Sequence, residues 1–131
     1  MALHPSVYAD LLRARIARHG VDCWLVNTGW SGGPYGVGAR MPIRFTRAII
    51  HAILGGTLAG VRSTPDPIFG VSIPVECPGV PDEILVPRKT WADSAAFEAK
   101  ARDLARSFVK NFEQFAGSVS PEVLAAGPRL E

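Results

Sequence analysis

A glycine-rich loop followed by a basic side chain is the part of this sequence whose residue types could do chemistry. Five glycines lie between positions 27 and 38, and Arg40, Met41 and Thr46 follow them. So many glycines indicate positive φ angles or a close approach of the backbone to something else. A guanidinium beside an apolar side chain can stack on a nucleobase and bond its edge or its sugar. A hydroxyl one helical turn further on can add a directional contact.

Neither of two common phosphate-binding motifs fits this loop. Gly33 and Gly38 have the spacing of GxxxxGK[ST], but Ala39 and Arg40 stand where the motif needs lysine and a hydroxyl. The loop therefore cannot hold a triphosphate and its Mg²⁺ in that manner. The GxGxxG pattern fails as well, because no glycine follows Gly38 at the required spacing. A strand-to-helix connection that binds no ligand is the alternative interpretation.

The elements that must position these residues follow from apolar periodicity and from residues that end helices. We expect helices at about 5–19, 43–54, 94–115 and 121–126, and strands at 23–26 and 69–75. The run Cys23-Trp24-Leu25-Val26 is apolar throughout, which is typical of a strand buried on both faces. Asp93 is expected to cap the third helix. The order predicts a single α/β unit over residues 1–131, with a small mixed sheet flanked by helices.

Composition narrows the function classes. The 14 basic and 12 acidic residues give a net charge of +2, which argues against nucleic acid as a partner. Cys23 and Cys77 lack metal-binding spacing and are expected to be reduced thiols of a cytoplasmic protein. His4, His19 and His51 have no carboxylate or cysteine partners in the pattern, so we expect no metal site.

Hydrophobic content bears on the membrane and on protein partners. The apolar runs are shorter than the roughly 20 residues that span a bilayer, and we expect no signal peptide and no membrane contact. The apolar fraction of 47% is high for a chain of 131 residues. Either the core is tightly packed, or some apolar surface faces a partner outside the chain.

Several short stretches together resemble the C-terminal part of ATP-dependent phosphoenolpyruvate carboxykinase. They extend over essentially the whole chain: Leu3-His4-Pro5, Val7-Tyr8-Ala9, Leu25-Val26-Asn27-Thr28-Gly29-Trp30, Gly36-Val37-Gly38, Arg40, Thr46-Arg47-Ala48-Ile49-Ile50, Asp66-Pro67-Ile68-Phe69-Gly70, Cys77-Pro78-Gly79-Val80, Pro87-Arg88, Thr90-Trp91 and Ala125-Ala126-Gly127-Pro128. In combination these stretches are highly specific. The resemblance implies that this chain folds as the C-terminal part of that family's nucleotide-binding domain.

The resemblance also implies an activity and a site. The family converts oxaloacetate and ATP to phosphoenolpyruvate, ADP and CO₂, a gluconeogenic step that uses a divalent metal, Mn²⁺ or Mg²⁺. By resemblance, Arg40, Met41 and Thr46 contact the adenosine end of ATP. The phosphate loop, the metal ligands and the oxaloacetate-binding arginine of the family lie upstream of everything present here. We therefore expect no catalytic and no metal-binding residue in this chain, and an inactive chain when it is alone.

Some alternatives stay open at this point. Ala39 stands where the family usually has lysine, and Pro42 replaces a residue with a backbone N–H. Either departure could weaken nucleotide contacts. If the loop binds no ligand, Arg40 is only a charged residue at the start of the second helix and Thr46 only caps local backbone groups. Met41 then only fills space in the core. The chain as a whole is either a segment of the carboxykinase, with the rest of that enzyme as its partner, or a free-standing binding module that forms homo-oligomers.

Overall fold

The computed structural model describes residues 3–130, which contain short strands between helices. The helices are α1 (Pro5–His19), α2 (Ile43–Leu54), α3 (Asp82–Leu85), α4 (Pro87–Thr90), α5 (Ser94–Phe112), the 3₁₀ helix η1 (Glu113–Ser118) and α6 (Pro121–Ala125). The strands are β1 (Trp30–Ser31), β2 (Ala39–Arg40), β3 (Ser63–Pro65) and β4 (Ser72–Pro74). The predicted α/β class is confirmed.

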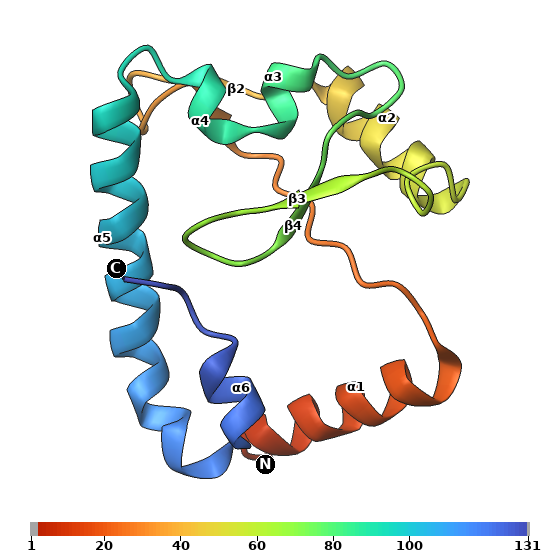
Figure 1. Cartoon of the computed structure of the whole chain (residues 1–131), viewed down its shortest axis with the longest axis vertical. Helices are drawn as coiled ribbons and strands as arrows, with labels where there is room; N and C mark the ends of the chain where they lie inside the picture. Colours follow the sequence, from red (N-terminus) through yellow and green to blue (C-terminus); the bar gives the residue numbers. More distant parts are fainter. Residues whose placement is uncertain (1–2, 131) are drawn as a thin grey trace.

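The elements are arranged as an open frame rather than as stacked layers (Figure 1). Helix α5 runs along one side, α1 crosses one end beside α6, and α2, α3 and α4 lie toward the other end. The β3–β4 hairpin occupies the middle, and its connecting loop extends toward α5. A long stretch of chain without secondary structure, drawn in orange, leads from α1 to the glycine loop.

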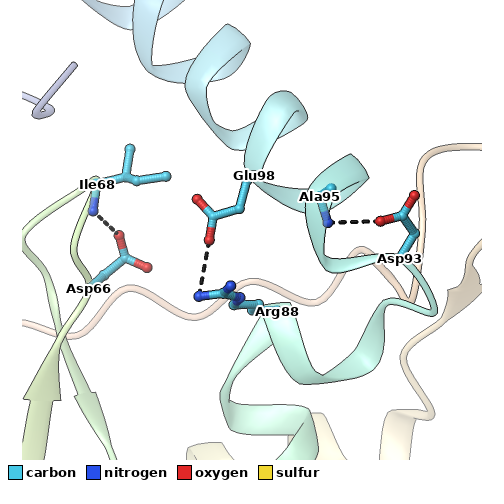
Figure 2. A network of polar contacts seen from close by, with 6 residues as sticks. All are labelled: Asp66, Ile68, Arg88, Asp93, Ala95 and Glu98. Atoms are coloured by element: carbon cyan, nitrogen blue, oxygen red, sulfur yellow. Dashed lines mark hydrogen bonds and ion pairs between the residues drawn. The ribbon is translucent and has the colours of Figure 1, made fainter. Parts of the chain in front are cut away.

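Local capping explains where the long helices begin and end. Pro5 occupies the first turn of α1, where its missing N–H costs nothing. Gly20 ends α1 in the left-handed conformation, with φ of 56°, and donates its N–H to the Ile16 carbonyl. Asp93 caps α5 by accepting hydrogen bonds from the amides of Ala95 and Ala96, the first of which is drawn in Figure 2. The predicted starts of these helices and the stop at Gly20 are confirmed.

The core consists of two small clusters. One lies around α2 and contains Ala52, Leu58, Cys77 and Val80. The other joins α5 to the loop between β3 and β4 and contains Ile68, Ala101 and Ala105. Each cluster is too small to bury more than a few side chains, and they share none of these buried residues.

The β3–β4 loop is fixed in place by hydrogen bonds at its tip. The Asp66 side chain accepts bonds from the amides of Ile68 (Figure 2) and Phe69, at 2.9 and 2.7 Å. The Arg129 amide donates to the Ile68 carbonyl at 2.7 Å. This second bond attaches the C-terminal stretch to the loop, so that Ile68 is held between the chain end and α5.

The chain exposes far more surface than an independent domain of its size. Its accessible surface is 9792 Å², whereas folded monomers of 14.0 kDa expose about 6,700 Å². Among the described residues no large side chain is fully buried. Apolar side chains of α1 and of the stretch after it are exposed, including Leu12 at 62% and Leu25 at 90%. Of the two explanations for the high apolar content, the structure therefore supports outward-facing apolar surface.

Three predicted elements differ from the structure. Residues 23–26 form no strand, and Leu25 is almost fully exposed instead of buried. The strand predicted at 69–75 is reduced to β4, because Gly70 turns the chain with φ of +69° and Pro74 has no N–H to donate. The third helix ends at Phe112, where η1 takes over.

The strands also pair differently from one small mixed sheet. β1 pairs with β2, and β3 pairs with β4, both antiparallel. Two separate two-stranded sheets result. The strands are only two or three residues long. The apolar run at 23–26, which was predicted to be a further strand, is unpaired in the described structure.

The two cysteines provide a test of this fold. Cys23 is exposed, whereas Cys77 is buried at 4% exposure, and burial raises the pKa of the Cys77 thiol. Because only the thiolate reacts, a raised pKa leaves less reactive Cys77 at any pH below it. We expect iodoacetamide at pH 8 to alkylate Cys77 at least about tenfold more slowly than Cys23. Peptide mass spectrometry over time measures both rates.

A Cys23→Ser variant is the matched control for this measurement. It should show only the slow reaction, which should become faster as the pH rises because the thiolate fraction of Cys77 grows. Equal alkylation rates at the two cysteines would contradict the burial of Cys77 in the α2 cluster.

Candidate functional site

The β1–β2 hairpin fixes the backbone position of Arg40. Trp30 pairs with Arg40 and Ser31 with Ala39 in the antiparallel register. The Met41 amide continues this pairing by donating to the Gly29 carbonyl at 3.0 Å. Arg40 and Met41 are therefore placed by pairing with residues 29–31, at the start of the glycine-rich stretch.

Glycine is required at particular points of the loop that closes this hairpin. Gly32 and Gly36 have φ of +83° and +89°, a region that other residues rarely adopt. At Gly38 an added Cβ would lie only 2.6 Å from the Ser31 carbonyl oxygen, so a side chain cannot fit there. The expected positive φ angles and close backbone approach are both confirmed, with the loop's own backbone as the group approached.

Helix α2 places Thr46 near the same hairpin. The helix begins at Ile43, directly after Pro42, so Thr46 lies one turn into it. The Thr46 hydroxyl donates to the Met41 sulfur at 3.7 Å. A thioether is a weak acceptor, so a ligand with a better acceptor can take over this hydroxyl at low cost.

A surface hollow of about 430 Å³ brings the predicted site residues together. It is lined by Thr28, Arg40, Met41, Ile43 and Thr46. Arg40 is exposed, and Met41 and Thr46 are half-buried. The lining consists of two apolar side chains, Met41 and Ile43, and three that carry hydrogen-bonding groups, Thr28, Arg40 and Thr46. The hollow thus offers an apolar surface beside hydrogen-bonding side chains.

Two lining residues were absent from the predicted site. Thr28 lies just before β1 and Ile43 at the start of α2. Ile43 lies between Met41 and Thr46 in the sequence, so its proximity along the chain could have found it. Thr28 lies 12 positions before Arg40, and the pairing of β1 with β2 brings it near. A second hollow of about 380 Å³, lined by residues that include Glu76, Cys77 and Asp82, lies beside the α2 cluster.

Comparison with known proteins identifies the family. The family model described as "Phosphoenolpyruvate carboxykinase" matches residues 1–83. The chain belongs to the phosphoenolpyruvate carboxykinase family. It is 63% identical over 123 residues to the phosphoenolpyruvate carboxykinase (ATP) of Geotalea uraniireducens. The aligned stretch covers 94% of this chain and 23% of that protein.

Further carboxykinases match over the whole chain. Phosphoenolpyruvate carboxykinase (ATP) 1 of Salinibacter ruber is 56% identical over 131 residues, and the aligned stretch covers 24% of that protein. The enzyme of Thermus thermophilus is 51% identical over 131 residues, and the aligned stretch covers 25% of that protein. The chain thus spans about a quarter of the length of the carboxykinases that it matches.

Metal-ligating side chains do not gather elsewhere among the described residues. Among residues 3–130, no three histidine, cysteine, aspartate or glutamate side chains come together in a way that could hold a metal ion. The described helices also include none long and apolar enough to cross a membrane. The hollow beside Arg40 is the place where the residues singled out in the sequence meet.

Thr90 attaches the glycine loop to helix α4. Its hydroxyl accepts a hydrogen bond from the Gly32 amide at 3.0 Å and donates to the Pro87 carbonyl at 2.7 Å. Helix α4, which carries Thr90, is in turn joined to α5 by an ion pair between Arg88 and Glu98 at 3.1 Å (Figure 2). Thr90 lies 58 residues from Gly32 in the sequence, so no local pattern could have revealed this contact.

Thr90→Val should loosen the loop without changing the size of the side chain. The substitution leaves the Gly32 amide and the Pro87 carbonyl without their shared partner in a half-buried position. We expect a loss of about 1 kcal/mol in local stability, seen as faster amide hydrogen exchange in peptides that contain Gly32. Thr90→Ser retains the hydroxyl and should exchange as the original chain does. Equal exchange rates in all three proteins would show that this bond does not hold the loop.

Proposed function

We propose that this chain is the C-terminal segment of an ATP-dependent phosphoenolpyruvate carboxykinase and supplies contacts to the adenosine of ATP. The whole enzyme converts oxaloacetate and ATP to phosphoenolpyruvate, ADP and CO₂, a cytoplasmic step of gluconeogenesis. The observation that carries this proposal is the single hollow shared by Arg40, Met41 and Thr46 in a chain of the carboxykinase family. The rest of the enzyme is the partner that this segment requires.

Each lining residue has a distinct task in this proposal. The Arg40 guanidinium stacks on the adenine or bonds the ribose, because it is exposed at the rim and carries several donors in one plane. Met41 provides a polarizable apolar shelf for the base. The Thr46 hydroxyl gives a directional bond when it leaves the Met41 sulfur. Pro42, which lies between Met41 and Thr46, has no backbone N–H to donate to the ligand. In this proposal the ligand is therefore recognised by the side chains of Arg40, Met41 and Thr46.

The chemical step itself belongs to the rest of the enzyme. Phosphoryl transfer depends mainly on positioning and on the electrostatic clamping of the phosphates, together with divalent metal. The residues described here do not fit a metal site, since no cluster of suitable ligands is present among them. Alone, the chain is proposed to be inactive and to bind ATP weakly.

A chimaera tests the proposal. This chain replaces the aligned 123-residue stretch of the Geotalea uraniireducens carboxykinase, to which it is 63% identical. We expect the chimaera to release CO₂ from oxaloacetate in an ATP-dependent manner, and the isolated chain to release none. A folded chimaera without activity, or an isolated chain with it, would contradict the proposal. Micromolar ATP affinity of the isolated chain in calorimetry would do so as well.

A second candidate is a free-standing module that forms homo-oligomers. The exposed apolar side chains of α1, such as Leu11 and Leu12 at 55% and 62% exposure, favour it. Light scattering distinguishes the two candidates. A defined oligomer of the isolated chain supports the module, whereas a monomer at high concentration counts against it.

A further inference from the structure

The Arg40 side chain depends on the backbone that carries it for its position. Among residues 3–130, the arginines that make side-chain hydrogen bonds or ion pairs are Arg13, Arg88 and Arg106. Arg40 is not one of them, and it is exposed at the rim of the hollow. The place that its guanidinium reaches is therefore set by the backbone of the β1–β2 hairpin.

One hydrogen bond joins this hairpin to a distant part of the fold. The Gly32 amide, directly after β1, donates to the Thr90 hydroxyl at 3.0 Å. Within residues 3–130, the other hydrogen bonds of residues 29–40 stay between positions 27 and 41. The two segments also approach closely here, because a Cβ at Gly32 would lie 3.1 Å from the Thr90 carbonyl oxygen.

Thr90 is itself held by its neighbours. Its hydroxyl donates to the Pro87 carbonyl at 2.7 Å, which leaves the oxygen lone pairs free to accept from Gly32. The next residue, Trp91, packs edge-on against Phe97 of α5, with ring centroids 5.6 Å apart. The ion pair drawn in Figure 2 also joins α4 to α5. Helix α5 thus provides a fixed base for the Thr90 hydroxyl.

The register of the hairpin connects the position of Gly32 to that of Arg40. Gly32 directly follows Ser31, which pairs with Ala39. One step back along β1, Trp30 pairs with Arg40. Directly opposite residues of an antiparallel pair have side chains on the same face, with Cβ atoms about 4.5–5.5 Å apart. Movement at Gly32 therefore shifts the residue pair that carries the guanidinium.

We propose that Thr90 is a positioning residue for nucleotide binding, which holds Arg40 at the hollow through the Gly32 amide and the β1–β2 hairpin. This inference rests on the proposed function. Thr90 does not line the hollow, so it acts without touching the ligand. Without its hydroxyl the Gly32 amide loses its partner, and the hairpin occupies several positions. ATP then binds only the fraction of molecules in which Arg40 is in place, which weakens the apparent affinity.

Calorimetric titration of the active chimaera with ATP tests the inference. Thr90→Val should weaken binding by about fivefold, the change that the loss of one net hydrogen bond produces. Thr90→Ala also removes the hydroxyl, without placing a methyl group against the Gly32 amide, and should have a similar effect. Thr90→Ser retains the hydroxyl and should restore the original Kd. Thr64→Val is the matched control, because this exposed threonine of β3 does not line the hollow.

A double-mutant cycle separates the positioning of Arg40 from a general loss of stability. If Thr90 acts through Arg40, Thr90→Val should cost about fivefold in the original background. In the Arg40→Ala background the same substitution should cost less than about twofold, because the side chain that it misplaces is already absent. A general loss of stability would cost the same factor in both backgrounds.

The outcomes separate the inference from the proposed function. If Arg40→Ala leaves the ATP affinity unchanged, the proposed function fails and the inference fails with it. If Arg40→Ala weakens binding and Thr90→Val does not, the inference is overturned and the proposed function stays in place. Equal losses from Thr90→Val in the two backgrounds also overturn the inference. So does a Thr90→Ser variant that binds ATP as weakly as Thr90→Val.

Discussion

Replacing Arg40 by alanine is expected to weaken ATP binding to the active chimaera by about tenfold or more. Hydrogen bonds to charged groups contribute about 1.5–3 kcal/mol, and the lower end applies here because Arg40 is exposed at the rim of the hollow. A loss of 1.4 kcal/mol corresponds to a tenfold change in Kd. Calorimetric titration with ATP measures this change directly, without depending on the rate of the chemical step.

Two further variants show whether the geometry of the guanidinium matters. Arg40→Lys retains the charge but not the planar fork, so its Kd should fall between those of the original protein and Arg40→Ala. Arg44→Ala is the matched control, because the Arg44 guanidinium lies 4.6 Å from the Phe45 ring centroid and does not line the hollow. A similar loss of ATP affinity in Arg44→Ala would mean that the effect comes from positive charge in general and not from a contact of Arg40. No loss in Arg40→Ala would remove Arg40 from the site.

Local signals explain which parts of the fold could be predicted. The start of α5 depends on the side chain of Asp93, two and three residues before the amides that it caps. The end of α1 depends on the ability of Gly20 to adopt positive φ. Such causes act within one turn of the chain, so they are visible in the sequence.

The proximity of the three predicted site residues has a related cause. Arg40, Met41 and Thr46 lie within seven positions, and a strand-to-helix turn brings such residues to one place. The hydrogen bond from Gly32 to Thr90 joins residues that are far apart in the sequence. Only the tertiary arrangement of α4 and the loop creates it, and no periodicity or motif marks it.

Residues 23–26 show why a strand pattern can predict an element that the described structure lacks. The run from Cys23 to Val26 has the composition of a buried strand, but a strand exists only when another strand pairs with it. None of the described residues does so. The apolar composition of residues 23–26 indicates a segment suited to a buried position, whereas the described structure leaves this segment exposed.

Replacing Leu58 by alanine should have the largest effect on the stability of the isolated chain. Leu58 is exposed by only 3% and packs with Ala52, Cys77 and Val80 in the cluster around α2. Leucine-to-alanine changes at such positions cost about 2–5 kcal/mol. We expect about 2–3 kcal/mol here, because a small cluster at the surface can partly collapse into the space. Urea unfolding followed by circular dichroism measures the loss.

Leu54→Ala is the matched control for this prediction, since the same atoms are removed from a side chain that is 81% exposed. Its effect should stay within about 0.5 kcal/mol. Because α2 carries Thr46, the Leu58→Ala variant of the chimaera should also bind ATP less tightly, although Leu58 does not line the hollow. Equal destabilisation by both substitutions would mean that the cluster around α2 does not hold the helix. The hollow would then depend on the rest of the enzyme for its shape as well as for its chemistry.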